Sequence, residues 1–307
     1  MAKAFGDPAV TRFFRAAALV LAATAIVACG GRGYTVPPVS ATPTSERHLG
    51  KWVWYDLLTH DGEVTERFYS ELFGWEFDEP VDDDSPFRAI SLRGTPIAGM
   101  FVVPEGDERV SRARWVPYVS VADVDDAVRF VEGQGGEVLA EAQNLEDRGR
   151  LAVVEDPQGA VFGVLHSTSG DPADLDAAPG GFLWTELWTR DVQEAVNFYH
   201  GLAGYSHVVM DFPSGGDYDV LQAEELPRAG VLRLPFEGVD PNWLPYVLVD
   251  DPHAIAQRVE ELGGTVFLGP DEELRSGSVA IIIDPSGAAL TIQQWPIPGE
   301  ERRGFPQ

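Results

Sequence analysis

Two acidic residues in aromatic, β-prone stretches have the clearest potential for chemistry. Asp56 lies two positions after Trp54. Glu186 lies two positions after Trp184. Because residues two apart in a strand share a face, each carboxylate is expected to stand beside an indole ring. Such a carboxylate can bind a polyhydroxy or cationic ligand, and it can act as a general base if burial raises its pKa. The alternative is a structural carboxylate bonded to a nearby arginine or backbone N–H.

Other catalytic and metal-binding patterns are weak in this sequence. The six histidines have no metal-ligand spacing such as His-x-x-x-His: His48, His60, His166, His200, His207 and His253. His166 ends a predicted strand, where it is either functional or simply solvated. The single cysteine, Cys29, excludes an intramolecular disulfide and a thiolate zinc cage. No GxGxxG, P-loop or GxSxG pattern supports nucleotide binding or serine hydrolysis.

The sequence pattern of the strands and helices that must position these residues occurs twice along the chain. Five landmarks recur in the same order at a nearly constant offset. They are Trp52–Leu57 and Phe182–Leu187, Phe68-Tyr69 and Phe198-Tyr199, Trp115–Val119 and Trp243–Val247, Gly135-Gly136 and Gly263-Gly264, and Asp156–Ala160 and Asp284–Ala288. The repetition indicates a duplicated domain.

Each copy has a strand-helix-strands rhythm. In the first copy we predict strands at 52–59, 87–92, 97–103, 115–121, 138–139, 151–155 and 161–165. Asp61 is a predicted helix N-cap before an amphipathic run that ends at Gly74, and a second helix is predicted over 124–134. Two such units in each copy predict an α+β architecture.

The order of these landmarks resembles the vicinal oxygen chelate superfamily of glyoxalase I, bleomycin-resistance proteins and extradiol dioxygenases. It is most similar to tandem two-domain glyoxalase-like proteins of actinobacteria, of the culture-filtrate antigen type. The resemblance covers residues 50–296 and implies paired βαβββ modules whose sheets curl around a cavity. We therefore expect domains at 50–168 and 182–297, with a linker at 169–181 and a tail at 298–307.

The resemblance also implies where a metal would bind. The family's ligand positions fall on Trp54 and Trp184 in the first strands and on Gly163 and Thr291 in the last strands. Because none of these is a good ligand, we expect no metal and no cofactor.

The same alignment makes six residues candidates for lining a cavity: Trp54, Asp56, Tyr118, Trp184, Glu186 and Tyr246. Tyr118 and Tyr246 could equally belong to the core. We expect a metal-free binding protein for a small organic molecule, with a possible sequestration or resistance role. The alternatives are a metal-dependent lyase, isomerase or dioxygenase of the superfamily, and a structural protein with filled cavities.

The first 28 residues resemble a lipoprotein signal peptide. Basic residues precede an apolar run at 16–28, which is shorter than the ~20 residues of a membrane span. Cys29 then stands in a lipobox-like context, which implies lipidation and an envelope-anchored protein; an uncleaved leader is the alternative. Residues 29–49 are expected to be a flexible tether. The net charge of −27 argues against a nucleic-acid partner, and nothing in the sequence specifies an oligomeric state.

Overall fold

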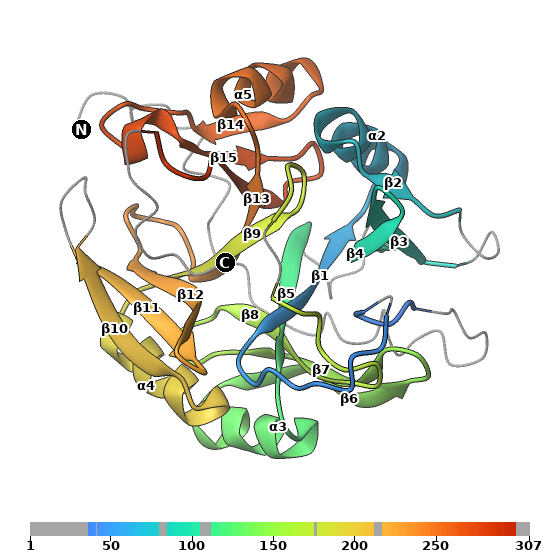
Figure 1. Cartoon of the computed structure of the whole chain (residues 1–307), viewed down its shortest axis with the longest axis vertical. Helices are drawn as coiled ribbons and strands as arrows, with labels where there is room; N and C mark the ends of the chain where they lie inside the picture. Colours follow the sequence, from blue (N-terminus) through green and yellow to red (C-terminus); the bar gives the residue numbers. More distant parts are fainter. Residues whose placement is uncertain are drawn as a thin grey trace.

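A computed structural model describes residues 36–40, 42–79, 85–104, 112–174, 177–211 and 217–298. The chain forms two eight-stranded mixed sheets, one in each predicted copy (Figure 1). Domain 1 contains β1 (Trp52–Thr59), α2 (Gly62–Phe73), β2 (Glu76–Phe77), β3 (Phe87–Leu92), β4 (Thr95–Val102), β5 (Arg114–Ser120), α3 (Val124–Gly133), β6 (Glu137–Leu145), β7 (Gly149–Glu155) and β8 (Val161–Ser167). Domain 2 contains β9 (Phe182–Thr189), α4 (Val192–Ala203), β10 (Ser206–Asp211), β11 (Asp217–Ala223), β12 (Leu226–Arg233), β13 (Asn242–Leu248), α5 (Pro252–Glu261), β14 (Thr265–Leu268), the short 3₁₀ turn η2 (Arg275–Gly277), β15 (Val279–Ile283) and β16 (Ala289–Gln293).

Each sheet joins two βαβββ modules. In domain 1 the strand order is β2-β3-β4-β1-β5-β8-β7-β6, and domain 2 repeats it as β10-β11-β12-β9-β13-β16-β15-β14. The first strand of a module pairs parallel with its last strand, and β1 pairs antiparallel with β5 at the centre. This is an α+β architecture of two tandem domains, each a pair of βαβββ modules, which confirms the predicted fold class.

Local signals placed most of these elements correctly. Asp61 caps α2 by accepting from the backbone N–H of Val64, and Gly74 ends the helix in the left-handed conformation with φ of 72°. The main difference is β6, which runs nine residues where a strand of two was expected. The sequence of β6 is polar and alternates only weakly, so it does not predict a strand; β6 forms because it pairs with β7.

The two faces of each sheet have different roles. On β1, Tyr55 and Leu57 point into a core that also contains α2 and residues of domain 2. Trp54 and Leu58 point to the other side, into a cluster built from domain 1 strands. We call this side the helix-free face of domain 1. In domain 2 the equivalent face carries Trp184, Trp188, Leu244 and Tyr246.

Several of the repeated landmarks form a reciprocal clamp between the domains. The hydroxyl of Tyr69 donates to Asp284 Oδ2 of domain 2 over 3.0 Å, and the Trp115 indole N–H donates to Tyr69. The mirror arrangement joins Tyr199 to Asp156 of domain 1 over 2.9 Å. Two cores that mix residues of both domains surround these bonds, and helices pair across the boundary as α2 with α5 and α3 with α4. The Phe-Tyr, Trp-x-Pro-Tyr and Asp-Pro-x-Gly motifs therefore serve assembly.

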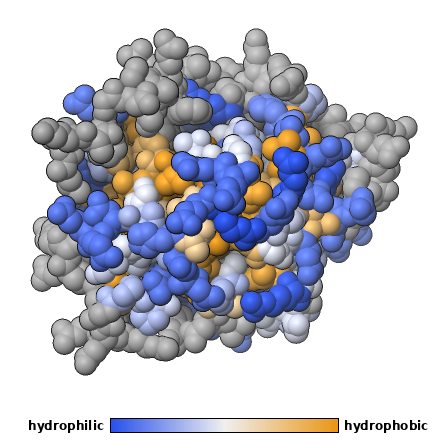
Figure 2. All heavy atoms as spheres, turned by 90° about the horizontal axis from the view of Figure 1, so that it is seen from above, coloured by the Kyte–Doolittle hydropathy of each residue, from blue (hydrophilic) through white to orange (hydrophobic). Residues whose placement is uncertain are grey.

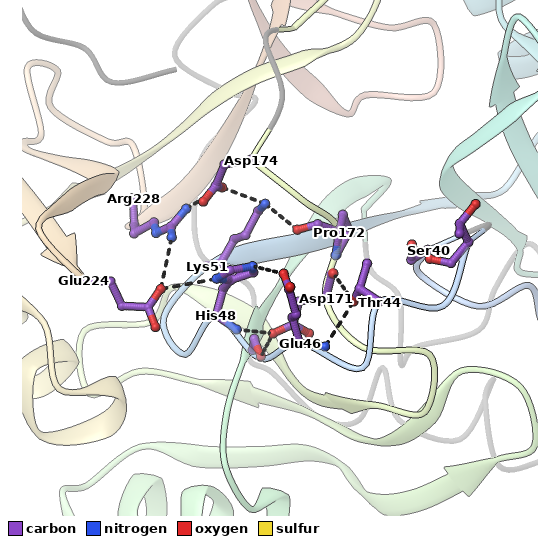
Figure 3. A network of polar contacts seen from close by, with 12 residues as sticks. Ser40, Thr44, Glu46, His48, Lys51, Asp171, Pro172, Asp174, Glu224 and Arg228 are labelled. Atoms are coloured by element: carbon purple, nitrogen blue, oxygen red, sulfur yellow. Dashed lines mark hydrogen bonds and ion pairs between the residues drawn. The ribbon is translucent and has the colours of Figure 1, made fainter.

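The described parts of the expected tether and linker lie against the body of the protein. Asp171 of the linker accepts from the His48 backbone N–H over 2.7 Å and from the Ser120 hydroxyl over 2.6 Å (Figure 3). Asp174 forms ion pairs with Lys51 and with Arg228 of domain 2. Described residues 42–49 are thus fixed by long-range contacts that composition does not reveal. Cys29 and the leader lie outside the described residues. Within the described residues, no helix is long and apolar enough to cross a membrane.

Candidate ligand-binding faces

A buried carboxylate stands at the centre of the helix-free face of domain 2. Glu186 has a side chain only 1% exposed. Its Oε1 accepts from the Trp188 indole over 2.9 Å and from the Tyr246 hydroxyl over 2.7 Å. Its Oε2 accepts from the Tyr218 hydroxyl over 2.7 Å and from Arg275 over 3.2 Å. Four donors therefore hold the carboxylate in one orientation.

The rest of the domain 2 cluster extends this network. Trp184 donates its indole N–H to Tyr218, so it reaches the carboxylate through a phenol. Arg275 also donates to Gln293 over 3.1 Å. Burial lowers the pKa of Arg275, but Tyr246, Glu186 and Tyr218 outweigh it and raise that pKa above its usual value. The guanidinium is a permanent cation that is already committed to protein partners.

Domain 1 carries a related arrangement around Asp56, which is 4% exposed. The Trp54 indole N–H donates to its Oδ1 over 2.7 Å, and Tyr118 also bonds to it. The guanidinium of Arg148 lies 3.8 Å above the Trp54 ring. Burial raises the pKa of Asp56, while Arg148, Trp54 and Tyr118 act in the opposite direction. Burial also lowers the pKa of Arg148, to about 10, so the arginine remains charged at neutral pH.

Glycines on neighbouring strands leave room for the two polar clusters. Gly99 pairs with Asp56 across β1 and β4, and a Cβ there would lie 2.5 Å from the carboxylate. In domain 2, Gly230 is the partner of Glu186, and a Cβ there would overlap the Tyr218 hydroxyl. Both carboxylates therefore depend on a glycine in the adjacent strand.

The structure brings together all six residues proposed from the sequence, in two groups of three. Tyr118 and Tyr246 join the polar clusters through their hydroxyls. Four further members were missed: Trp188, Tyr218 and the two arginines, Arg148 and Arg275. The sequence does contain a signal for the arginines. Arg148 precedes Gly149 just before β7, and Arg275 precedes Gly277 just before β15, so the two arginines stand at matching places in the two copies.

The histidines take no part in either cluster. His60 and His166 each bond to a backbone carbonyl at a strand end, those of Val103 and Val121. Within the part of the chain that the structure describes, no group of three or more His, Cys, Asp or Glu side chains is placed to hold a metal ion.

The residues at the family's metal positions do not fit a metal. Each face offers one carboxylate, and its oxygens already accept from indole, phenol or guanidinium donors. In the last strands, Gly163 has no side chain, and Thr291 contributes one hydroxyl beside Tyr246. A divalent cation next to the charged Arg148 or Arg275 would also be repelled.

The two faces differ in how far they are covered. In domain 2, wall residues such as Leu183, Trp184, Phe236 and Phe267 are partly exposed. Figure 2 views the molecule from the side on which α5 lies in Figure 1, and it shows apolar side chains in a recess between polar ones. In domain 1, Trp54 is only 1% exposed.

Comparisons with known proteins agree with this architecture. The model of the family described as "Glyoxalase-like domain" matches residues 52–165. The protein "Putative glyoxylase CFP32" of Mycobacterium bovis is 32% identical over 250 residues, which are 81% of this chain and 96% of the relative. "Anthracycline biosynthesis protein DauV" of Streptomyces sp. (strain C5) is 30% identical over 257 residues, covering 79% and 92%.

Solved structures show the same fold at low identity. The Mn(II)-bound glyoxalase from Novosphingobium aromaticivorans has a TM-score of 0.53 at 17% identity, with 80% of this chain and 82% of that chain covered. The 2,3-dioxygenase LapB from Pseudomonas sp. KL28 has a TM-score of 0.53 at 14% identity, with 83% and 96% covered. Fold, duplication and full-length relatives lead to one conclusion: the chain belongs to the glyoxalase-like family of the vicinal oxygen chelate superfamily.

Proposed function

We propose that the protein binds a small organic molecule with an aromatic body on the helix-free face of domain 2. The observation that carries this proposal is the Glu186 carboxylate, held by four donors, beside apolar walls that remain partly exposed. Sites for small organic ligands have this composition: mostly apolar walls with a few fixed polar groups that orient the ligand. Donor networks that are already satisfied favour positioning over acid–base chemistry.

The relatives support this choice of ligand class. Two of them, DauV and DnrV of Streptomyces, are described as anthracycline biosynthesis proteins, and anthracyclines are polycyclic aromatic compounds. The glyoxylase description of CFP32 supports the enzymatic alternative instead. That alternative needs a metal or a free acid–base pair. The residues at the family's metal positions, and the hydrogen bonds that Asp56 and Glu186 already accept, weigh against the metal route.

Neutral naphthalene-2-methanol is a suitable probe for the domain 2 face. We expect Phe267→Ala to weaken its binding about tenfold, which corresponds to ~1.4 kcal/mol, in calorimetric titrations of the full chain. Val209→Ala is the matched control, because Val209 is an exposed apolar residue on the edge strand β10. The proposal is wrong if the probe does not bind, or if both variants affect binding equally. Stoichiometric Mn, Fe, Ni or Zn in protein purified without chelators would favour the lyase or dioxygenase alternative.

We also propose that the protein is anchored to the cell envelope through Cys29. The support is the sequence alone: a basic leader, an apolar run and the single cysteine in a lipobox-like context. Incorporation of a palmitate analogue is expected in the unaltered chain, and Cys29→Ala should abolish it and release the protein from membranes. Equal labelling of the two would remove this part of the proposal.

A further inference from the structure

The helix-free face of domain 1 is occupied by the chain's own residues. We call residues 36–40 the covering segment. Val36 and Val39 are each 4% exposed and belong to the same apolar cluster as Trp54 and Phe101. The Nε–H of Arg148 donates to the carbonyl oxygen of Pro37 over 2.7 Å. The segment therefore takes the place that a ligand would take against the Asp56 cluster.

The covering segment is held less firmly than the chain that follows it. Residues 42–49 are bonded to the linker, where the Thr44 N–H donates to the Ser169 carbonyl. The His48 N–H donates to Asp171, as Figure 3 shows. By contrast, residues 36–40 form no strand with the sheet. Their described attachment is the burial of Val36 and Val39, the partial burial of the other three residues, and one hydrogen bond to the Pro37 carbonyl. Such a segment can leave the face while residues 42–49 stay in place.

The hydrogen-bonding groups of Arg148 indicate which kind of ligand would fit this face. Its Nη2 is buried without a hydrogen-bond partner among the described residues. Nε and Nη2 form the side-on edge of a guanidinium, which matches the two oxygens of a carboxylate. Arg150 shows the complete pairing in this same chain, with Nε 3.0 Å from Asp125 Oδ2 and Nη2 2.5 Å from Asp125 Oδ1. The Pro37 carbonyl supplies only one of these two oxygens.

Domain 2 does not offer an arginine edge of this kind to a ligand carboxylate. Arg275 directs Nη2 to Glu186 and Nη1 to Gln293, so its cation is paired within the protein. In domain 1, Arg148 instead lies over the Trp54 ring, and its Nε–H is directed at the covering segment. The duplicated faces have therefore diverged in the chemistry they offer.

We propose that the helix-free face of domain 1 is a second ligand site, specific for a monocarboxylate with an apolar body, which binds by displacing the covering segment. The carboxylate pairs with Nε and Nη2 of Arg148, and the apolar body replaces Val36 and Val39. This second site extends the function proposed for domain 2. It rests on that proposal only in assuming that the helix-free faces of these domains bind ligands. The form in which residues 36–40 cover the face cannot bind the carboxylate ligand. The apparent affinity is therefore the affinity of the open form multiplied by the fraction of molecules that are open.

The test compares 2-naphthoate with its methyl ester in calorimetric titrations of the full chain. We expect 2-naphthoate to bind and the ester to bind at least tenfold more weakly at this site. The double variant Val36→Ser, Val39→Ser should tighten 2-naphthoate binding about tenfold, because it favours the open form. Arg148→Lys keeps the charge but loses the two-point edge, and it should weaken binding at least tenfold. Arg150→Lys is the matched control and should bind as the unaltered protein does.

Hydrogen exchange of the unaltered protein needs no variant. Saturation with 2-naphthoate is expected to speed amide exchange at Val36, Val39 and Ser40, the residues of the covering segment that have an amide hydrogen, and to leave residues 44–50 unchanged. Carboxylate binding without faster exchange there, or with no dependence on Arg148, would overturn the proposal. Naphthalene-2-methanol, whose binding depends on Phe267, reports on domain 2 separately, so failure of either site is recognised by its own probe.

Discussion

At the scale of single residues, the buried pair Glu186–Arg275 has the largest expected effect on stability. The two side chains are 1% and 9% exposed. Removing one member of a buried pair leaves the other charged and desolvated. We expect Arg275→Met to lower the free energy of unfolding by about 3 kcal/mol, measured by urea denaturation. Adding Glu186→Gln to that variant should restore part of the loss, because the uncompensated charge disappears.

The exposed pair Arg190–Asp240 provides the control, since its side chains are 56% and 43% exposed. Arg190→Met should change stability by less than about 1 kcal/mol. Similar losses in the two arginine variants would show that the Glu186 cluster is not electrostatically special.

Glu155 links stability to pH. Burial, aided by Glu137, Asp156 and Asp240 and opposed by Arg114, raises the pKa of Glu155 from 4.5 to about 7. The folded protein therefore holds this proton more tightly than the unfolded chain does, and the associated stability is present at low pH and lost as pH rises from about 4.5 to 7. We expect Glu155→Gln to gain stability relative to the unaltered protein over this window, in urea midpoints measured from pH 5 to 8. Glu132→Gln, at an exposed site, should show no such trend.

At the scale of elements, helix ends show why local sequence predicted so much of the fold. Gly74 closes α2 with φ of 72°, and a Cβ there would meet nothing within 4 Å. Gly133 lies in α3 with equal space around it. We expect Gly74→Ala to cost about 1 kcal/mol, because only its backbone conformation is unfavourable for alanine. Gly133→Ala should be neutral or stabilising by up to ~1 kcal/mol. Equal thermal shifts in the two variants would contradict this explanation.

What the sequence left unpredicted depends on contacts between distant elements. Caps and alternation are local, so α2, β1 and the face shared by Trp54 and Asp56 were predictable. Arg148 meets Trp54 only because the sheet brings the turn before β7 over β1. The covering segment likewise reads as a flexible proline-containing stretch until its contact with Arg148 is seen. Residues far apart in the chain complete both clusters, and the repeated arginine before a glycine does not by itself show which side chains either arginine meets.

At the scale of the whole molecule, the reciprocal clamp makes the two domains one cooperative unit. Each clamp joins a tyrosine of one domain to an aspartate of the other, Tyr69 to Asp284 and Tyr199 to Asp156. Both lie within cores that contain residues of both domains. Neither domain can therefore lose its fold without exposing part of the core that stabilises the other.

Removing the tyrosine hydroxyls tests this cooperativity. Tyr69→Phe and Tyr199→Phe each remove the tyrosine donor from the Oδ2 of a buried aspartate and leave an indole N–H without its acceptor, at a cost of about 1–3 kcal/mol. The clamps share no residue, so each variant is the other's matched control and the double variant should lose the sum of the two. Tryptophan fluorescence and far-ultraviolet circular dichroism should report one common transition in every variant. Two separated transitions would mean that the domains unfold independently. In that case the duplicated motifs would stabilise each domain separately and would not make the tandem a single folding unit.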